Sequence, residues 1–147
     1  MRLSVTTPRG ALVDTNVEEL TAPGLLGEFG VLPGHVPLMS ALKPGVLTYR
    51  AADHTGTLAV GEGFLQVAPT GAPTGNEATP SDRVLVLVDQ AVNATAVDRA
   101  AAEKDFAKLE AEIAAWKGDL DGTYQALCVR RDWAMAQLNA AARLNPS

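Results

Sequence analysis

The chain changes character close to residue 93, and this change limits the folds open to it more than any other feature. Before that point the sequence is rich in β-branched residues, glycine and proline, whereas alanine dominates after it. The second part has no proline before Pro146, and its glycines are Gly118 and Gly122. Glycine and proline interrupt regular structure, β-branched residues favour strands, and alanine favours helices. We therefore predict a β domain over residues 1–92 and an α-helical domain over residues 93–147.

The first domain consists of short apolar segments separated by turn signals. We predict strands over residues 2–7, 11–13, 17–21, 29–32, 37–42, 46–50, 57–60, 64–68 and 83–88. Pro23 and Gly24 are expected to lie beyond the end of the third strand, and residues 53–56 are expected to form a hairpin turn. No helix separates the strands, which favours an antiparallel sandwich or barrel. A single flat sheet exposes Leu and Val on both faces, so two packed layers are preferred.

Apolar residues recur with a helical period in the second domain. One stripe predicts a helix over residues 96–117, with Thr95 as its N-cap and Gly118 as its stop. The stripe consists of Ala102, Phe106, Leu109, Ile113 and Trp116. A second helix is predicted over residues 123–144, with one side formed by Tyr124, Leu127, Met135 and Leu138. The short linker predicts an antiparallel hairpin, which buries few large groups and is marginal unless it docks on another surface.

Residues 69–82 depart from the strand pattern. Residues 68–75 repeat Ala-Pro-Thr-Gly in tandem, and further polar residues with Pro80 follow. Proline removes a backbone donor and glycine costs ordering entropy, so we predict a mobile loop. Two interpretations stay open, an insertion without function and a binding loop.

Charge and composition exclude several functional classes. The net charge is −5, with the basic residues scattered, which argues against nucleic acid and anionic lipid surfaces as partners. The sequence has no apolar stretch long enough for a membrane-spanning helix, and residues 1–10 lack the apolar core of a secretory signal. Cys128 is the single cysteine, so no internal disulfide forms and a reducing compartment is expected.

The usual catalytic patterns are missing from the sequence. No serine lies in a nucleophile elbow, and no glycine-rich loop ends in Gly-Lys-Ser/Thr. His35 and His54 without a cysteine pair do not predict a structural zinc site. We therefore predict no catalytic residue, no metal and no cofactor.

The segment from Pro23 to Pro44 is rich in glycine and proline and contains few large side chains between these residues. Glu28 lies between Gly27 and Phe29 and is the one carboxylate of this stretch. A rigid loop with one acid and one histidine is better suited to docking than to acid–base catalysis, because no second titratable group is close in sequence. The alternative is a buried Glu28 that caps backbone donors.

These residues carry a resemblance to a known family. Residues 27–38 are Gly-Glu-Phe-Gly-Val-Leu-Pro-Gly-His-Val-Pro-Leu, residues 42–47 are Leu-Lys-Pro-Gly-Val-Leu, and residues 61–67 are Gly-Glu-Gly-Phe-Leu-Gln-Val. With Val-Leu-Val-Asp at 86–89 and the helical hairpin that follows, nearly the whole chain resembles the epsilon subunit of F-type ATP synthases. The insertion at 69–82 departs from the family, which has a short turn there.

The resemblance implies a ten-stranded β-sandwich followed by two antiparallel helices. It implies a non-catalytic subunit of the central stalk that binds the gamma subunit and the c-ring and turns with them during proton-driven ATP synthesis. Such a subunit is peripheral and lies at the cytoplasmic face of a bacterial inner membrane. The helices of the family can extend toward the alpha and beta subunits and restrain ATP hydrolysis.

The resemblance also assigns contact residues. The polar loops of the c-ring, which carry arginine, are expected to face Gly27, Glu28, Phe29 and Gly30. The gamma subunit is expected to face Thr7, His35, Val36, Pro37, Leu38 and Met39.

Nucleotide binding is the feature of some relatives that does not carry over. Their ATP motif begins the first helix, and here Arg99 and Ala100 match it while Ala96 stands at its aspartate. Trp133 and Gln137 stand where those relatives have arginines on the second helix. A triphosphate site that loses these charges loses most of its affinity, so no ATP site is expected. The alternative functions are a stand-alone nucleotide-sensing module and a small hydrolase, and the latter lacks a catalytic triad or a metal cluster.

Overall fold

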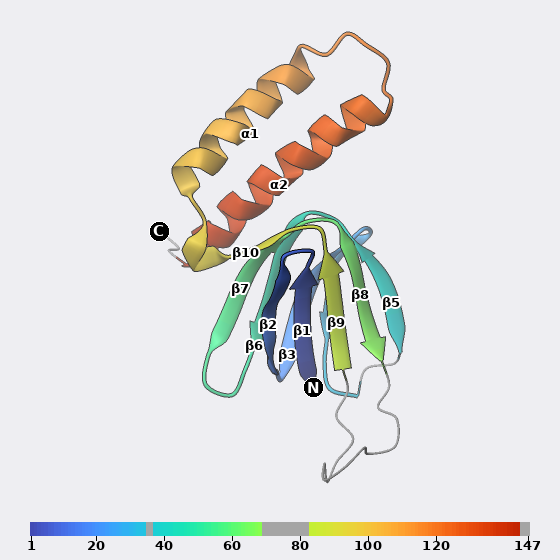
Figure 1. Cartoon of the computed structure of the whole chain (residues 1–147), viewed down its shortest axis with the longest axis vertical. Helices are drawn as coiled ribbons and strands as arrows, with labels where there is room; N and C mark the ends of the chain where they lie inside the picture. Colours follow the sequence, from blue (N-terminus) through green and yellow to red (C-terminus); the bar gives the residue numbers. More distant parts are fainter. Residues whose placement is uncertain (35–36, 69–82, 145–147) are drawn as a thin grey trace.

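The computed structural model describes residues 1–34, 37–68 and 83–144 and contains ten strands followed by two helices (Figure 1). The strands are β1 (Arg2–Thr7), β2 (Gly10–Asn16), β3 (Glu19–Gly24), β4 (Gly27–Val31), β5 (Leu38–Leu42), β6 (Gly45–Arg50), β7 (Thr55–Val60), β8 (Gly63–Ala68), β9 (Arg83–Val88) and β10 (Ala91–Asn93). A 3-10 turn, η1 (Ala94–Ala96), leads into α1 (Arg99–Ala114) and α2 (Gly122–Leu144). The predicted β-sandwich followed by a two-helix hairpin is confirmed.

The strands form one continuous sheet that bends over itself into two layers. Its order is β10-β7-β6-β3-β5-β8-β9-β1-β2, with β4 added to β3. Strand β3 pairs with β6 along Glu19–Thr21 but with β5 only through Gly24 and Leu42, which is where the sheet turns from one layer to the other. The pairings are antiparallel except between β1 and β9, where Leu3 lies opposite Val84 in a parallel register.

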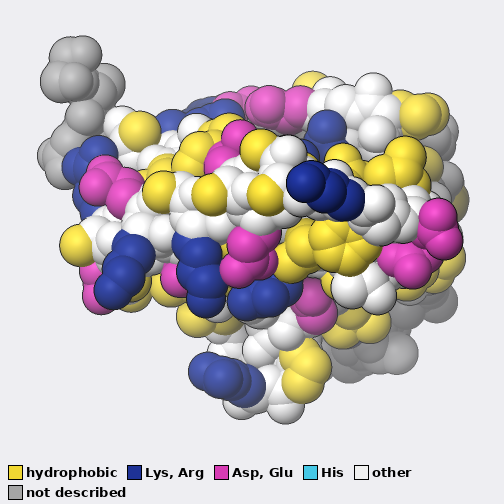
Figure 2. All heavy atoms as spheres, turned by 90° about the horizontal axis from the view of Figure 1, so that it is seen from above, with side chains coloured by type: hydrophobic (Ala, Val, Ile, Leu, Met, Phe, Trp, Pro, Cys, Tyr) yellow, Lys and Arg dark blue, Asp and Glu magenta, His cyan; other side chains and the backbone are white. Residues whose placement is uncertain are grey.

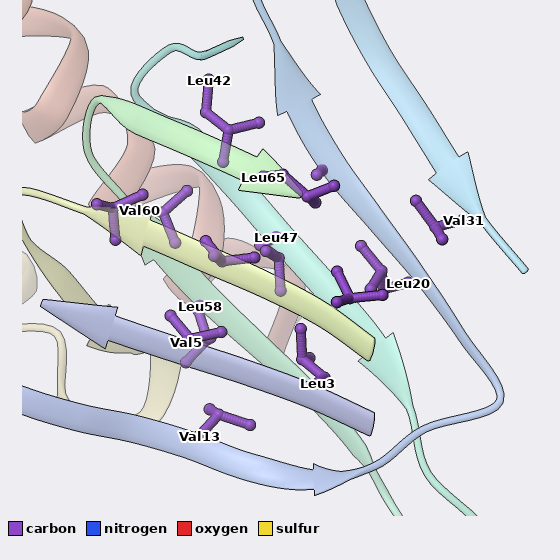
Figure 3. Close-up of a cluster of buried hydrophobic side chains, with 14 of the residues drawn as sticks. Leu3, Val5, Val13, Leu20, Val31, Leu42, Leu47, Leu58, Val60 and Leu65 are labelled. Atoms are coloured by element: carbon purple, nitrogen blue, oxygen red, sulfur yellow. The ribbon is translucent and has the colours of Figure 1, made fainter. Parts of the chain in front are cut away.

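The core lies between the two layers. Figure 3 shows side chains from strands of both layers pointing toward one another. The largest fully buried ones are Leu3, Leu20, Leu47, Leu58, Leu65, Val5, Val31, Val60, Val67, Val84 and Val86. The alternating burial along β9 follows from the two-residue period of a strand, which sends Val84, Val86 and Val88 inward. This aliphatic core contains no residue of the helical hairpin.

Several predicted boundaries are wrong. Pro23 and Gly24 lie inside β3, because β4 folds back on them and pairs Pro23 with Glu28. The hairpin turn expected at 53–56 ends earlier, since Thr55 and Gly56 belong to β7 and pair with β6. Strand β10 was not predicted, because it is three residues long and its sequence, Ala-Val-Asn, carries no strand signal.

The caps of the first helix also differ from the prediction. The N-cap is Asp98, whose Oδ1 accepts from the backbone N–H of Ala101 at 3.1 Å. Thr95 instead lies in η1, where its N–H donates to Asn93 Oδ1 at 3.0 Å, and the extended backbone of Val97 separates the turn from α1. The helix ends at Ala114, before Gly118.

The hairpin docks on the sandwich mainly through α2. In Figure 1, α2 runs along the end of the sheet and α1 lies on its far side. Ala136 and Ala140 of α2 pack with Val46 of β6, Ala59 of β7 and Ala94 of η1. We call this group the alanine contact. Trp133 and Val92 pack against its edge and are partly buried.

Gly63 begins β8 where the backbone of β9 approaches closely. A Cβ at this position overlaps the carbonyl oxygen of Leu87. We expect Gly63→Ala to lower the free energy of unfolding by about 2–3 kcal/mol, because backbone atoms have to move. Gly30→Ala is the matched control, since the nearest atom there is 3.8 Å away. Urea denaturation of the isolated chain measures both, and equal midpoints contradict the prediction.

Candidate functional site

Glu28 lies on the β3–β4 hairpin at an edge of the sheet. Strand β4 pairs with β3 and with no other strand among the described residues. Gly27 has φ +131, a conformation that glycine adopts without strain, and it places Glu28 opposite Pro23. The Glu28 side chain is exposed, and among the described residues it has no hydrogen-bond or ion-pair partner. The alternative of a buried, backbone-capping Glu28 is therefore wrong.

The other residues predicted to contact the c-ring differ in exposure. Gly27 and Gly30 are exposed, whereas Phe29 is half-buried and packs against the core. The four residues alternate along β4, so Glu28 and Gly30 lie on the face opposite Phe29. Glu28 is thus the polar side chain that this strand presents to solvent.

Of the residues expected to face gamma, Thr7 lies at the end of β1, the exposed Pro37 precedes β5, and Leu38 and Met39 begin β5. Thr7 ends β1, and its Oγ1 donates to the Gly10 carbonyl at 3.4 Å, which closes the β1–β2 turn. His35 and Val36 lie outside the described residues. Leu38 packs against the core, whereas Met39 is 67% exposed on the opposite face of β5.

Met39 belongs to a larger exposed surface that the sequence interpretation missed. Phe64 on β8 is 55% exposed, and Leu85 and Leu87 on β9 also face solvent. The registers place Leu87 opposite Phe64, and Leu85 opposite Gln66, which in turn pairs with Met39. We call these four apolar residues the outer apolar face. The signal was the run Val-Leu-Val-Leu-Val at 84–88, which has no polar alternation and is typical of a strand covered on both sides.

Charged residues lie along one side of the outer apolar face. A depression of about 380 Å³ there is lined by Arg2, Asp14, Gln66, Arg83 and Leu85 among others. The Nε of Arg2 donates to Asp14 Oδ1 at 2.8 Å. This hydrogen bond, together with the charges of Arg2 and Arg83, holds the pKa of Asp14 below its ordinary value. The surface therefore combines an apolar centre with a charged rim, as protein interfaces do.

Most of the residues predicted to pack inside the hairpin are at least partly buried. Leu109 is buried, and the half-buried residues are Phe106, Ile113, Trp116, Tyr124, Leu127 and Leu138. The rings of Trp116 and Tyr124 lie 5.9 Å apart, and Arg131 Nη1 donates to Glu110 Oε1 at 3.3 Å between the helices. Met135 was placed on this inner side by the sequence and is instead 41% exposed. The top view shows side chains of both charges mixed with hydrophobic ones on the hairpin (Figure 2).

The described residues offer little for catalysis or metal binding. No three His, Cys, Asp or Glu side chains in residues 1–34, 37–68 and 83–144 come close enough to hold a metal ion. Within the same ranges, none of the helices combines the length and the apolar character that a membrane crossing needs. Trp133 packs against the alanine contact, and Gln137 beside it is half-buried. The features that remain are surfaces: Glu28 on its hairpin, the outer apolar face and the alanine contact.

Comparisons with known proteins agree with this description. Residues 1–72 match the family model described as ATP synthase, Delta/Epsilon chain, beta-sandwich domain. The ATP synthase epsilon chain of Magnetococcus marinus is 39% identical, with 94% of this chain and 91% of the relative covered. That of Anaeromyxobacter sp. (strain K) is 36% identical, with 97% and 98% covered.

Two solved structures share the fold. A chain of the Euglena gracilis mitochondrial ATP synthase, in a structure of its OSCP, F1 and c-ring, has a TM-score of 0.64 at 20% identity and covers 98% of this chain and 78% of its own. A chain of the Tetrahymena thermophila mitochondrial ATP synthase central stalk and c-ring has a TM-score of 0.60 at 17% identity and covers 96% of each. The sequence matches extend over both domains, and the chain therefore belongs to the ATP synthase epsilon chain family.

Proposed function

We propose that this chain is a non-catalytic rotor subunit that joins the gamma subunit to the c-ring in the central stalk of a bacterial, proton-driven ATP synthase. It is a peripheral protein at the cytoplasmic face of the inner membrane. The outer apolar face carries the proposal, since four large apolar side chains on one side of an otherwise filled sandwich mark a protein interface. Family membership supports the same assignment.

The gamma subunit covers the outer apolar face in this proposal. Met39 is common to that face and to the gamma-facing residues that the resemblance implies, which links the two sets. The remaining members of the predicted set are Thr7, His35, Val36, Pro37 and Leu38. Leu38 supports the surface from inside, because it packs against the core beneath β5.

Copurification tests the proposal. We expect Phe64→Asp combined with Leu87→Asp to remove the chain from the purified synthase, since two carboxylates then face an apolar partner without charge compensation. Thr55→Asp is the control, because it adds a carboxylate at an exposed position of β7, a strand that carries no member of the outer apolar face. The wild-type chain and the control should purify with the alpha, beta, gamma and c chains. A double variant that still copurifies in full amount contradicts gamma contact through this face.

The hairpin supplies the second part of the proposed function. It restrains ATP hydrolysis by leaving the alanine contact and extending toward the alpha and beta subunits. The small size of that contact supports this part, since it involves few side chains and lies outside the main core. The proposal includes no nucleotide site, because Trp133 and Gln137 carry no positive charge for a triphosphate.

A further inference from the structure

Two arginines lie next to each other on the outer side of the sheet. Arg2 on β1 lies opposite Arg83 on β9 in the parallel register of these strands, which run side by side in Figure 1. Their neighbours Leu3 and Val84 are buried in the core, so both arginines lie on the outer side. Like charges at opposite positions of neighbouring strands repel each other. The pair is therefore unfavourable in the isolated chain unless negative charge offsets it.

One carboxylate of the chain offsets part of this charge. Asp14 on β2 accepts a hydrogen bond from Arg2 Nε at 2.8 Å. This hydrogen bond, together with the charges of Arg2 and Arg83, lowers the pKa of Asp14, so the surroundings favour an anion. The guanidinium of Arg83 forms no hydrogen bond or ion pair within residues 1–34, 37–68 and 83–144. Two guanidinium groups and one carboxylate leave one positive charge here, in a chain whose net charge is −5.

The arginines border the depression of about 380 Å³ on this side of the sheet. Its lining also includes Ser4 and Gln66, which lie opposite Leu85 on the two strands that flank β9. A hydroxyl, a side-chain amide and a guanidinium all donate hydrogen bonds. A carboxylate that enters the depression beside Arg83 therefore meets three kinds of donor and a positive charge that has no ion-pair partner among the described residues.

The depression adjoins the outer apolar face. Leu85 belongs to both, and Leu87 of the apolar face follows it two residues further along β9. Apolar contacts are non-directional, so the outer apolar face alone does not fix the orientation of a partner. Charged groups at the rim of an interface select the partner and its orientation. The residue at the rim that is suited to this task is Arg83.

We propose that the depression receives one aspartate or glutamate side chain of the gamma subunit, whose carboxylate pairs with the Arg83 guanidinium. This inference rests on the proposed function, and it makes Arg83 the residue that orients gamma on the outer apolar face. A guanidinium binds a carboxylate through two parallel hydrogen bonds, which give the contact a direction. A multiply charged anion such as phosphate fits less well, because the Asp14 carboxylate shares the depression and repels it.

Binding of the full chain to purified gamma tests the inference. We expect Arg83→Gln to weaken binding about fivefold at low ionic strength and less than about twofold at about 1 M salt, because salt screens the pair. Arg83→Glu should weaken binding about thirtyfold at low ionic strength, since a carboxylate then faces the acid of gamma. Lys104→Gln is the control, because it removes the same charge from an exposed position of α1, and it should bind like wild type.

The melting temperature of the isolated chain separates this role from a structural one. Arg83→Gln should not lower it, because without gamma the substitution removes the repulsion between Arg83 and Arg2. A charge exchange then identifies the partner residue. Each aspartate and glutamate of gamma is replaced singly by lysine, and one of these variants should bring the affinity for the Arg83→Glu chain back to within about threefold of the wild-type pair.

Three outcomes overturn the inference. Equal affinity and equal salt dependence of wild type and Arg83→Gln remove Arg83 from the interface. Weaker binding that none of the gamma variants restores shows that Arg83 has no carboxylate partner there. A saturable rise of the wild-type melting temperature with inorganic phosphate, lost in Arg83→Gln, makes a free anion the occupant. Failure of the proposed function looks different, since the wild-type chain then does not bind gamma at all.

Discussion

Replacing Ala136 with aspartate is expected to release the helical hairpin from the sandwich while the sandwich stays folded. Ala136 is 1% exposed in the alanine contact, and no basic side chain belongs to that cluster. Burying an unpaired carboxylate costs about 3 kcal/mol or more, whereas each buried methyl group contributes only about 0.8 kcal/mol. Undocking therefore costs less than keeping the charge buried. The main core excludes the hairpin, so it is not disrupted.

Tryptophan fluorescence measures this release. Trp133 packs against the alanine contact, so its emission shifts to the red when α2 leaves the sheet. A Trp116→Phe background removes the other tryptophan. Ala142→Asp is the matched control, because Ala142 is exposed on the same helix. In this control the Trp133 emission should equal that of the Trp116→Phe background. An unshifted Ala136→Asp variant with wild-type stability shows that the docked hairpin tolerates the charge, contrary to the prediction.

Ending the chain after Ala96 is expected to raise ATP hydrolysis by the reconstituted enzyme. This truncation keeps β10 paired with β7 and keeps η1 with its Asn93 cap, so the sandwich loses no strand. We expect a rise of at least about fivefold, the lower end of common allosteric couplings. ATP hydrolysis by the assembled alpha, beta and gamma subunits, with full-length or truncated chain added, gives the comparison.

ATP hydrolysis with the Ala136→Asp variant should be compared with hydrolysis with the truncated chain. It retains the helices but weakens the docked state, so an extended, inhibitory hairpin predicts lower hydrolysis than wild type. The two variants should thus change the rate in opposite directions. If both raise it, the docked hairpin is the inhibitory form. If the truncation leaves hydrolysis unaltered, the hairpin exerts no restraint.

The sequence predicted those strands and helices in which apolar side chains recur with the period of the element. Strand β9 was placed at its observed ends, because Val84, Val86 and Val88 alternate within a run bounded by charged residues. The stripe through Leu109 located α1 for a similar reason, since large apolar residues recur on one side of the helix. The alanine contact could not be found this way. Alanine occurs all around α2, and no pattern distinguishes Ala136, which is buried, from Ala142, which is exposed.

The candidate surfaces were predictable in part. Glu28 was identified because it stands alone between glycines, and it is exposed as a docking residue requires. The outer apolar face was missed although Leu85 and Leu87 are visible in the sequence. The two-residue period of a strand predicts that Leu85 and Leu87 lie on the face opposite the valines. It does not predict whether that face meets solvent or a second layer. The exposure of that face depends on how the sheet bends. The bend in turn depends on pairings between segments that are distant in the sequence, such as β5 and β8.

The parallel pairing of β1 with β9 has a consequence for the time order of folding. As the chain leaves the ribosome, Leu3 and Val5 emerge first and can pair locally with β2. Their other neighbours, Val84 and Val86 of β9, emerge only after β2 to β8 have been made. The edge of β1 that faces β9 therefore stays unpaired through most of synthesis. Pairing it with β9 requires a contact between segments distant in the sequence, which forms slowly. We expect nascent chains that end before β9 to be vulnerable to proteases and to edge-to-edge association, and completion of β9 to end this period.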